Sequence, residues 1–264
     1  MPERYAIIAM IGACALDRSG MLGVEVTTTG TGGAAASSST GGAIASSTST
    51  SASGGAGGAP NGSGGGGGAP LDCTSGDLIA CYRFEGDLLD GSGNNHHLAP
   101  QGTVQYMPGV EGQSVRIAGD TVLLAAFTNS WVSTSLTVEM WIRPQSIPSD
   151  RAALLDNACC YSVFLYDDGS LRCNVGAESV YGGNVVPNTW THVACVHDGT
   201  SLRAYVGGML VGSVNSAPLT PVNTSTAIGV NVPELDSRFD GDIDSVRVWS
   251  VPLSDQQICE AAGC

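Results

Sequence analysis

The fold class is decided by residues 189–213, which read TWTHVACVHDGTSLRAYVGGMLVGS. Apolar, aromatic and β-branched residues fill three short runs here, and the turn-forming pairs Asp198-Gly199 and Gly207-Gly208 separate them. Asp-Gly and Gly-Gly supply the backbone conformations that tight hairpin turns require. This stretch therefore predicts three consecutive antiparallel strands.

Five further segments show the same pattern of apolar, aromatic and β-branched residues bounded by Gly, Pro or Asp: 78–84, 136–143, 161–166, 170–175 and 242–249. A short helix over 255–258 is predicted to follow the last of them, with Ser254 as its N-cap. Short strands at this spacing, joined by tight turns, favour an all-β fold in which two antiparallel sheets form a sandwich.

Charge and composition exclude several classes of protein. The chain of 264 residues has 10 basic and 24 acidic residues, which gives a formal net charge of -14. Electrostatic binding to nucleic acid requires a surplus of Lys and Arg, so we expect no nucleic-acid partner. The sequence contains no apolar run long enough for a membrane-spanning helix, which argues against a chain that crosses a membrane repeatedly.

Residues 26–71 differ in composition from the rest of the chain. They contain no charged side chain and consist almost entirely of Gly, Ala, Ser and Thr. Such a segment has little apolar surface to bury and cannot offset the entropy lost on ordering. We therefore interpret residues 14–71 as a disordered low-complexity tether and residues 72–264 as one folded domain.

The N-terminal segment has an apolar run that ends in the pattern Gly12-Ala13-Cys14, and it resembles a bacterial lipoprotein signal peptide. The resemblance implies removal of residues 1–13, attachment of lipid to Cys14, and contact with the membrane through this anchor only. Ala15 follows the cysteine, which by analogy with enteric bacteria implies the outer membrane or cell surface. An ordinary secretory signal and a wrongly placed start codon are the alternatives.

Cysteine content supports export of the protein. Without Cys14, eight cysteines remain, and an even number in an exported domain predicts a framework of four disulfide bridges. One group lies at the ends of the domain and the other in its middle: Cys73, Cys81, Cys259 and Cys264, then Cys159, Cys160, Cys173 and Cys195. Adjacent residues of a strand face opposite sides, so Cys159 and Cys160 are expected to take separate partners.

Four motifs occur in order along the folded part: CYRFEGDLLDGSGNNHHL (81–98), LTVEMWIRP (136–144), the 189–213 stretch, and FDGDIDSVRVWSVPLSDQQI (239–258). Together they resemble a LamG-like jelly-roll domain of the concanavalin A-like lectin/glucanase superfamily. The resemblance implies that the first and last strands share a sheet and that the cysteines at the domain's ends pair within their own group. It also implies that the middle cysteines bridge the hairpin strands and that Trp141, Trp190 and Trp249 occupy core positions.

Glucan-cutting enzymes of this superfamily carry carboxylates at alternate positions of one strand, which places them on one face. The most similar string here contains Glu234, Asp236 and Asp240, but its third acid is one step too far and it lies where the family has a loop. A serine-nucleophile motif of the GxSxG kind is also missing. We therefore predict a protein without catalytic activity.

The resemblance also implies one structural calcium ion between the first and last strands. Calcium takes six to eight oxygen ligands, and the matching positions are Glu85, Asp90 and Asp244, with Asp87 and Asp242 as alternatives. Solvated turn carboxylates are the simpler interpretation of the same residues.

A sugar site requires an exposed aromatic face with hydrogen-bonding groups beside it. Trp131 lies outside the shared motifs and Tyr181 lies in a predicted loop, so these two residues are the candidates for stacking on a sugar. The sequence thus predicts a non-catalytic surface module that binds a glycan or a cell-surface protein. A purely structural or adhesive lipoprotein and a glycan hydrolase with an unrecognised site are the alternatives.

Overall fold

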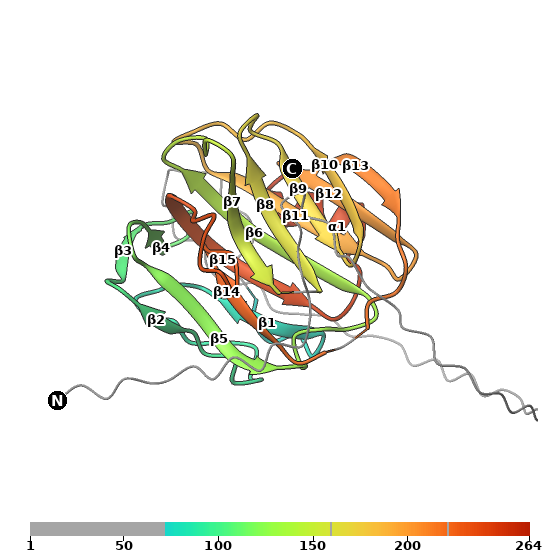
Figure 1. Ribbon diagram of the computed structural model, residues 1–264, viewed down its shortest axis with the longest axis horizontal. Helices are drawn as coiled ribbons and strands as arrows, with labels where there is room; N and C mark the ends of the chain where they lie inside the picture. Colours follow the sequence, from blue (N-terminus) through green and yellow to red (C-terminus); the bar gives the residue numbers. More distant parts are fainter. Residues whose placement is uncertain (1–71, 159, 221) are drawn as a thin grey trace, which may run out of the picture. The chain divides into compact units, whose positions relative to one another are not determined.

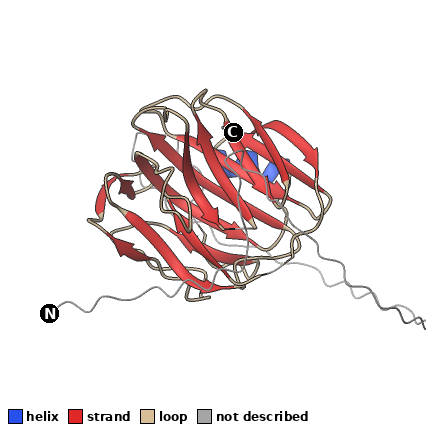
Figure 2. Cartoon of the chain, viewed as in Figure 1, coloured by secondary structure: helices blue, strands red, loops and turns tan. Residues whose placement is uncertain are grey.

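The computed structural model describes residues 72–158, 160–220 and 222–264. Within these residues fifteen strands form two antiparallel sheets that pack face to face, and one short helix follows the last strand (Figures 1 and 2). This architecture confirms the predicted all-β sandwich. The predictions for residues 1–71, including the signal peptide, the tether and Cys14, lie outside the described residues.

The first sheet has eight strands and contains both the first and the last strand of the domain. Its order is β13 (Met209–Asn215), β12 (Ser201–Val206), β11 (Thr191–His197), β6 (Leu136–Pro144), β15 (Gly241–Trp249), β4 (Gln113–Ile117) and β3 (Gln105–Pro108), and β1 (Leu78–Tyr82) also pairs with β15. The expected pairing of the first and last strands is therefore confirmed.

The second sheet has seven strands. Its order is β10 (Glu178–Gly182), β9 (Leu171–Val175), β8 (Tyr161–Tyr166), β7 (Arg151–Asn157), β14 (Thr224–Ile228), β5 (Val122–Thr128) and β2 (Ala99–Gln101). The hairpin predicted over 161–175 appears as β8 and β9, and Gly169 provides the positive φ of 80° that their turn requires.

The hydrophobic core fills the space between the two sheets, because alternate residues of each strand point to it. In β6, Val138, Met140 and Ile142 belong to the core, whereas Glu139 and Trp141 face the other side of the sheet. In β8 and β9 the core receives Tyr161, the aliphatic residues and Cys173, whereas Phe164, Tyr166 and the polar residues point outward.

A buried ion pair lies on the outer face of the eight-stranded sheet. Glu139 is fully buried, and its carboxylate accepts hydrogen bonds from Trp249 Nε1 at 2.8 Å and from His192 Nε2 at 3.2 Å. Arg247 Nε lies 2.9 Å from the same carboxylate. Burial raises the pKa of Glu139, but the hydrogen bonds and the positive charge outweigh it, so the pKa lies below its usual value. The carboxylate is therefore charged and compensated.

The C-terminal helix α1 (Asp255–Ala262) is longer than the predicted 255–258 and begins where expected. Ser254 is its N-cap and forms a capping box with Gln257, and Gly263 ends it in the left-handed conformation. Ile258 packs on Ala194 and other apolar residues of the outer face of the eight-stranded sheet. Among the described residues, no helix has the length and hydrophobicity needed to span a bilayer.

Three disulfide bridges join six of the described cysteines. Cys173 in β9 is bonded to Cys195 in β11, so this bridge links the two sheets through the core. The expected link between the two hairpins is confirmed by this bond.

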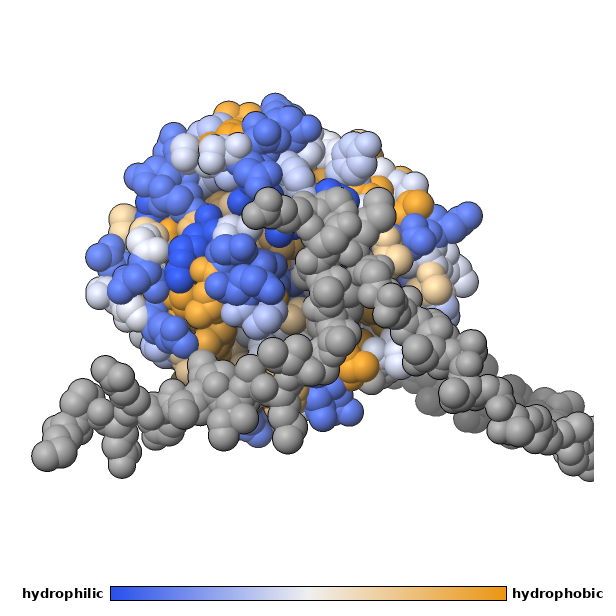
Figure 3. All heavy atoms as spheres, viewed as in Figure 1, coloured by the Kyte–Doolittle hydropathy of each residue, from blue (hydrophilic) through white to orange (hydrophobic). Residues whose placement is uncertain are grey.

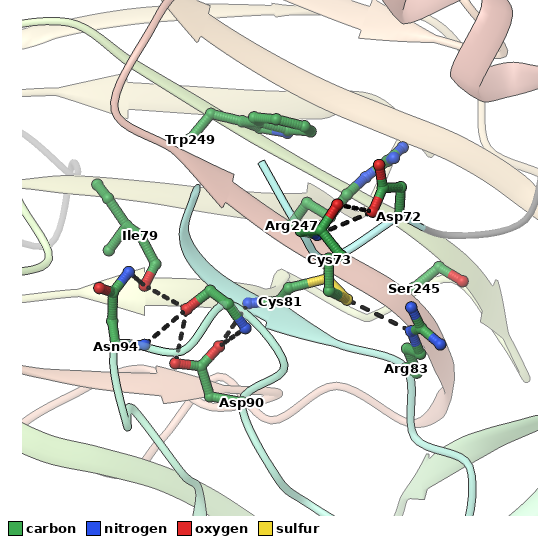
Figure 4. Close-up of a disulfide and its surroundings, with 12 residues drawn as sticks. Asp72, Cys73, Ile79, Cys81, Arg83, Asp90, Asn94, Ser245, Arg247 and Trp249 are labelled. Atoms are coloured by element: carbon green, nitrogen blue, oxygen red, sulfur yellow. Dashed lines mark hydrogen bonds between the residues drawn. A yellow bond between two sulfur atoms is a disulfide. The ribbon is translucent and has the colours of Figure 1, made fainter. Parts of the chain in front are cut away.

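The cysteines at the domain's ends pair within their own group, as expected, but each bridge is local. Cys73 is bonded to Cys81 (Figure 4), and Cys259 is bonded to Cys264. Backbone hydrogen bonds pair β1 with β15. Neither of these two bridges links the N-terminal end of the domain to its C-terminal end.

Cys160 differs from the expected framework. It lies in the turn between β7 and β8, not in a strand, and its N–H donates to the Asn157 carbonyl at 3.0 Å. Its thiol is free and buried in the core, and burial raises its pKa to about 11. The argument that strand geometry separates Cys159 from Cys160 therefore does not apply, and Cys159 lies outside the described residues.

Candidate ligand-binding face

The outer face of the seven-stranded sheet divides into two halves. Over β14 and β5 it is covered by the 230–239 loop, whose Val230, Val232 and Leu235 pack on apolar residues of these strands. Over β7 to β10 it carries aromatic, hydroxyl, amide and guanidinium groups: Arg151, Ser162, Phe164, Tyr166, Arg172, Asn174, Ser179 and Tyr181. We call this half the β7–β10 face. The same side of the domain shows hydrophilic residues with small hydrophobic patches between them (Figure 3).

Strand register places these residues in rows across the sheet. Phe164, Arg172 and Tyr181 are cross-strand neighbours on β8, β9 and β10. Ser162, Asn174 and Ser179 form the adjacent row. Neighbouring strands are about 4.8 Å apart, so each row spans about 10 Å, which is long enough to contact a short oligosaccharide.

Arg172 is held in place by two hydroxyl groups. Its Nη1 donates to Tyr166 Oη at 2.9 Å and its Nη2 to Ser179 Oγ at 3.0 Å, while Cζ lies 5.2 Å from the centroid of the Tyr166 ring. In the adjacent row Asn174 Nδ2 donates to Ser162 Oγ at 2.9 Å. Arg172 Nε and Asn174 Oδ1 have no hydrogen-bond partner among the described residues, but both atoms are buried. The capacity for a ligand therefore lies in the other polar atoms of these ordered side chains, such as the second N–H of each Arg172 Nη.

Tyr181 is the most accessible aromatic residue of this face, with 67% of its surface exposed. It lies in β10 and not in a loop, because its neighbours 178–182 pair with β9. The strand fixes the backbone at this position, so Tyr181 is in register with Arg172 on the next strand. Tyr181 thus meets the geometric requirement for stacking on a sugar, and its role in binding stays a prediction.

Trp131 is wrongly predicted as a stacking residue. Its side chain is fully buried, with ring centroids 4.9 Å from His96 and 6.5 Å from Tyr82. Its carbonyl oxygen accepts a hydrogen bond from Tyr161 Oη at 3.1 Å. Trp131 fills the space at one end of the core, and no ligand can reach it without unfolding this region.

The three tryptophans expected in the core are half-buried on the outer side of the eight-stranded sheet or next to it. Trp141 packs edge-on against His192, and Arg143 lies 4.7 Å above the Trp190 ring. Trp249 contacts the outer apolar cluster and donates to Glu139. The expectation is wrong because alternation identifies two faces of a strand but does not say which one meets the other sheet.

A buried carboxyl group that sequence analysis missed borders the β7–β10 face. Asp156 of β7 is 2% exposed, and its Oδ2 accepts the Val232 N–H at 2.8 Å. Burial raises its pKa to about 7, and the Glu234 and Asp236 carboxylates add to the shift while the Val232 N–H opposes it. The Glu234 and Asp236 carboxylates each accept a hydrogen bond from Asn231 Nδ2. Glu234 and Asp236 thus lie in a loop, as expected, and not on a strand.

Asp90 does not fit the expected calcium site. Its two carboxylate oxygens accept four hydrogen bonds, from the N–H groups of Cys81, Ser92 and His96 and from the Ser92 hydroxyl (Figure 4). These bonds use the lone pairs that a cation would need. Asp90 instead fixes the loop after β1, and within the described residues no group of three or more His, Cys, Asp or Glu side chains is placed to hold a metal ion.

Glu85 and Asp244 converge on one loop, Gly109–Gly112. Asp244 is buried and accepts hydrogen bonds from the Val110 N–H at 2.8 Å, the Glu111 N–H at 3.4 Å and the Ser245 hydroxyl at 3.2 Å. Burial nevertheless raises its pKa to about 6. Glu85 accepts the Gln113 N–H at 3.0 Å. A side-chain carbon at Gly109 would collide with the Asp244 carboxylate, and one at Gly112 with that of Glu85. Two carboxylates beside a glycine loop offer oxygen ligands of the kind that calcium prefers.

The two alternative ligands are placed elsewhere. Asp242 forms ion pairs with Arg143 at 2.9 Å and Arg116 at 3.5 Å, so its charge is already compensated. Asp87 is exposed and accepts the Leu89 N–H at 3.1 Å. Both carboxylates thus have partners outside the Gly109–Gly112 loop.

Most residues of the β7–β10 face were missed because no local motif marks them. A signal does exist in the 161–175 hairpin. Val163, Leu165, Leu171 and Cys173 are all core residues, so the alternate positions of the same strands must point outward. Those alternate positions hold aromatic, Arg and Asn side chains where a solvated face commonly holds Lys and Glu, and this difference could have identified the face.

A family model agrees with the architecture and the motifs. Residues 117–259, more than half of the chain, match the Laminin_G_3 model of the concanavalin A-like lectin/glucanases superfamily. The chain belongs to this superfamily. No curated protein is significantly similar to it in sequence.

Several solved structures share the fold. Domain 4 of AbnA, a GH43 extracellular arabinanase from Geobacillus stearothermophilus solved in complex with arabinotriose, is 24% identical with a TM-score of 0.61, covering 70% of this chain and 98% of that domain. The binding domain of botulinum neurotoxin DC in complex with SialylT is 15% identical with a TM-score of 0.57, covering 71% of this chain. The binding domain of Paraclostridial Mosquitocidal Protein 1 is 17% identical with a TM-score of 0.57, covering 70% of this chain. This chain spans about half the length of each toxin domain.

Proposed function

We propose that the 72–264 domain is a non-catalytic binding module and that it holds a glycan on the β7–β10 face. The observation that carries this proposal is Tyr181, whose ring is 67% exposed on a strand and lies in register with Arg172. The apolar face of a sugar ring stacks on an aromatic side chain, while its hydroxyl groups need donors and acceptors close by. Asn174, Ser162 and Ser179 supply such groups in the adjacent row.

The arrangement of carboxyl groups supports binding without hydrolysis. A glycosidase needs two carboxyl groups on opposite sides of one scissile bond. On the β7–β10 face the bordering carboxyl groups, Asp156, Glu234 and Asp236, are held by Val232 and Asn231. The fold is also that of domain 4 of AbnA, whose structure contains arabinotriose.

A glycan array tests the proposal with the full chain and two matched variants. Tyr181→Ala removes the exposed ring, and we expect its affinity for any retained glycan to fall about tenfold, since an aromatic contact contributes about 1 kcal/mol beyond its buried area. Phe127→Ala is the control, because Phe127 is 61% exposed on β5 of the same sheet but far from β10 in the strand order. Retention of no glycan would favour the structural or adhesive alternative, and release of reducing sugar from a retained glycan would favour a hydrolase.

Calcium is a further part of the proposal. We propose that Glu85, Asp244 and backbone carbonyl groups of the Gly109–Gly112 loop hold one calcium ion, which would supply charge compensation to two neighbouring carboxylates. The raised pKa of Asp244, caused by burial, supports this assignment because it marks an undercompensated carboxylate. Calcium should raise the Tm of the protein, and Asp244→Asn should abolish this effect while Asp87→Asn leaves it intact. An equal Tm in calcium and in chelator would contradict the assignment.

We also propose that the module is exported and held at the outer membrane or cell surface by lipid on Cys14. The support is the small-small-Cys pattern at 12–14 and the disulfide bridges, which form in oxidising compartments. Mass spectrometry of the mature N-terminus tests it. A lipid-modified fragment that starts at Cys14 is expected, and an unmodified Met1 would refute the anchor.

A further inference from the structure

The arginines of the β7–β10 face differ from most others in their partners. All ten basic residues of the chain are arginines, in a protein with a net charge of -14. Four of those in the described residues form ion pairs with carboxylates: Arg116, Arg143, Arg203 and Arg247. Arg151 and Arg172 lie on the β7–β10 face, and neither has a carboxylate of a described residue within ion-pair distance.

Both guanidinium groups are oriented towards the aromatic residues of β8. Arg151 comes from β7, in register with Tyr166, and its Cζ lies 4.9 Å above the Phe164 ring. Arg172 comes from β9, in register with Phe164, and lies over the Tyr166 ring. The strands that carry them are two positions apart in the sheet, a distance of about 10 Å. The two cations therefore lie on the same face, Arg151 over the buried Phe164 ring and Arg172 over the half-buried Tyr166 ring.

Arg172 keeps part of its binding capacity. A guanidinium group has five N–H donors, and Arg172 uses two of them, on the hydroxyls of Tyr166 and Ser179, while its Nε is buried. One N–H on each Nη is left for a ligand. Hydroxyl partners fix the orientation of the group but do not compensate its charge. A carboxylate matches the planar fork of arginine and forms charge-assisted hydrogen bonds with it, which are stronger than bonds between neutral groups.

The acidic residues around the face leave Arg172 open to an anion. Asp156, Glu234 and Asp236 lie on the side of β7 and the 230–239 loop, and each accepts a hydrogen bond within that region. Arg151 is the cation on that side, and its charge lowers the pKa of Asp156 against the larger effect of burial. At the β8–β9 turn, Asp168 accepts the Ser170 N–H, and its exposed neighbour Asp167 completes the turn.

We propose that the β7–β10 face binds an acidic glycan, one whose sugar residues carry carboxylate groups, and that Arg172 recognises the carboxylate. This inference rests on the proposed glycan-binding function and adds the class of glycan. Tyr181 stacks on a sugar ring, and Arg172 beside it on the next strand distinguishes an acidic sugar from its neutral counterpart. The pairing of an exposed ring with an uncompensated guanidinium group carries the proposal.

The test compares acidic and neutral ligands of the same shape at physiological ionic strength, with the full chain. Two matched probe pairs are trigalacturonic acid with its methyl ester, and sialyllactose with lactose. We expect the acidic member of at least one pair to bind about tenfold or more tightly than the neutral member. Arg172→Gln should make the two affinities equal, whereas Arg172→Lys, which keeps the charge but loses the fork, should retain part of the preference.

Arg83→Gln is the control, because Arg83 also has no carboxylate of a described residue within ion-pair distance but follows β1 in the other sheet. It should leave the preference unchanged. The unmodified protein could bind both members of each pair with equal affinity, and Tyr181→Ala could abolish the binding of both members. This result would overturn the proposal of an acidic glycan and leave the proposed glycan-binding function intact. Failure of every probe to bind would overturn both. Arg172→Gln protein with an unchanged preference would overturn the role of Arg172 alone.

Discussion

The bridge between Cys173 and Cys195 should be the strongest single contributor to stability among the three disulfides. It links β9 to β11, in different sheets, and encloses a sequence separation of 22 residues. Replacing both cysteines by alanine restores the entropy of this loop to the unfolded chain, and the chain-entropy relation gives a loss of about 3 kcal/mol. For a domain of this size such a loss lowers Tm by about 6–12 °C.

The bridge between Cys259 and Cys264 is the matched control, since its sequence separation is only 5 residues. The same relation gives about 2 kcal/mol for it, and the difference between the two bridges is about 1.3 kcal/mol. Loss of contacts at Cys173 and Cys195, which are buried, increases the difference further. The cost of each double variant is measured by urea unfolding of the full chain, followed by tryptophan fluorescence without reductant.

Refutation requires one result. If Cys259→Ala/Cys264→Ala destabilises the protein as much as Cys173→Ala/Cys195→Ala, loop entropy does not control the contribution of these bridges. Reduction of the unmodified protein provides a second measurement, because it should lower stability by more than either double variant.

Three other perturbations test the packing and the charges. Glu139→Gln should reduce the free energy of unfolding by about 3 kcal/mol, because the substitution leaves the Arg247 charge without its buried partner. Urea unfolding measures this loss, and a loss below about 1 kcal/mol would contradict the prediction. In the folded protein the pKa of Asp156 is about 7, which is above its value in the unfolded chain. The protonated carboxyl group therefore stabilises the fold at low pH, and this stabilisation is lost as the pH rises from about 4 to 7. Relative to Asp156→Asn, the unmodified protein should therefore lose about 1.4 kcal/mol per pH unit between pH 5 and 7, and parallel curves would disprove the assignment. Trp131→Ala should reduce the free energy of unfolding, measured by thermal unfolding, by about 3–5 kcal/mol, whereas Tyr181→Ala should change it little. A larger loss for Tyr181→Ala than for Trp131→Ala would show that the two side-chain environments are misassigned.

The fold could be predicted because its signals are local. The pair Gly207-Gly208 predicts a turn wherever the rest of the chain lies, and the 161–175 hairpin has alternating aliphatic residues on both strands. The pairing of β1 with β15 is a long-range feature, and it was predicted only through the resemblance to a family.

The candidate face was less predictable, because exposure depends on tertiary packing. Trp131 and Tyr181 are both aromatic residues between predicted strands, yet one is fully buried and the other is 67% exposed. Only the positions of Tyr82 and His96, which are distant in sequence, explain the difference. In the same way, Asp90 is at a position where the family resemblance implies a calcium ligand, but the N–H groups around it use its oxygens.

The local bridge between Cys73 and Cys81 affects how the domain would bear mechanical load. A force that reaches the domain at Asp72 passes through the bond between the sulfurs directly to Cys81, near the end of β1. Residues 74–80 then lie outside the loaded path and cannot be peeled from β15 one by one. Rupture has to begin at Cys81, which pairs with Arg247. The Cys73–Cys81 bridge therefore protects the first strand when the domain is pulled from its N-terminal side.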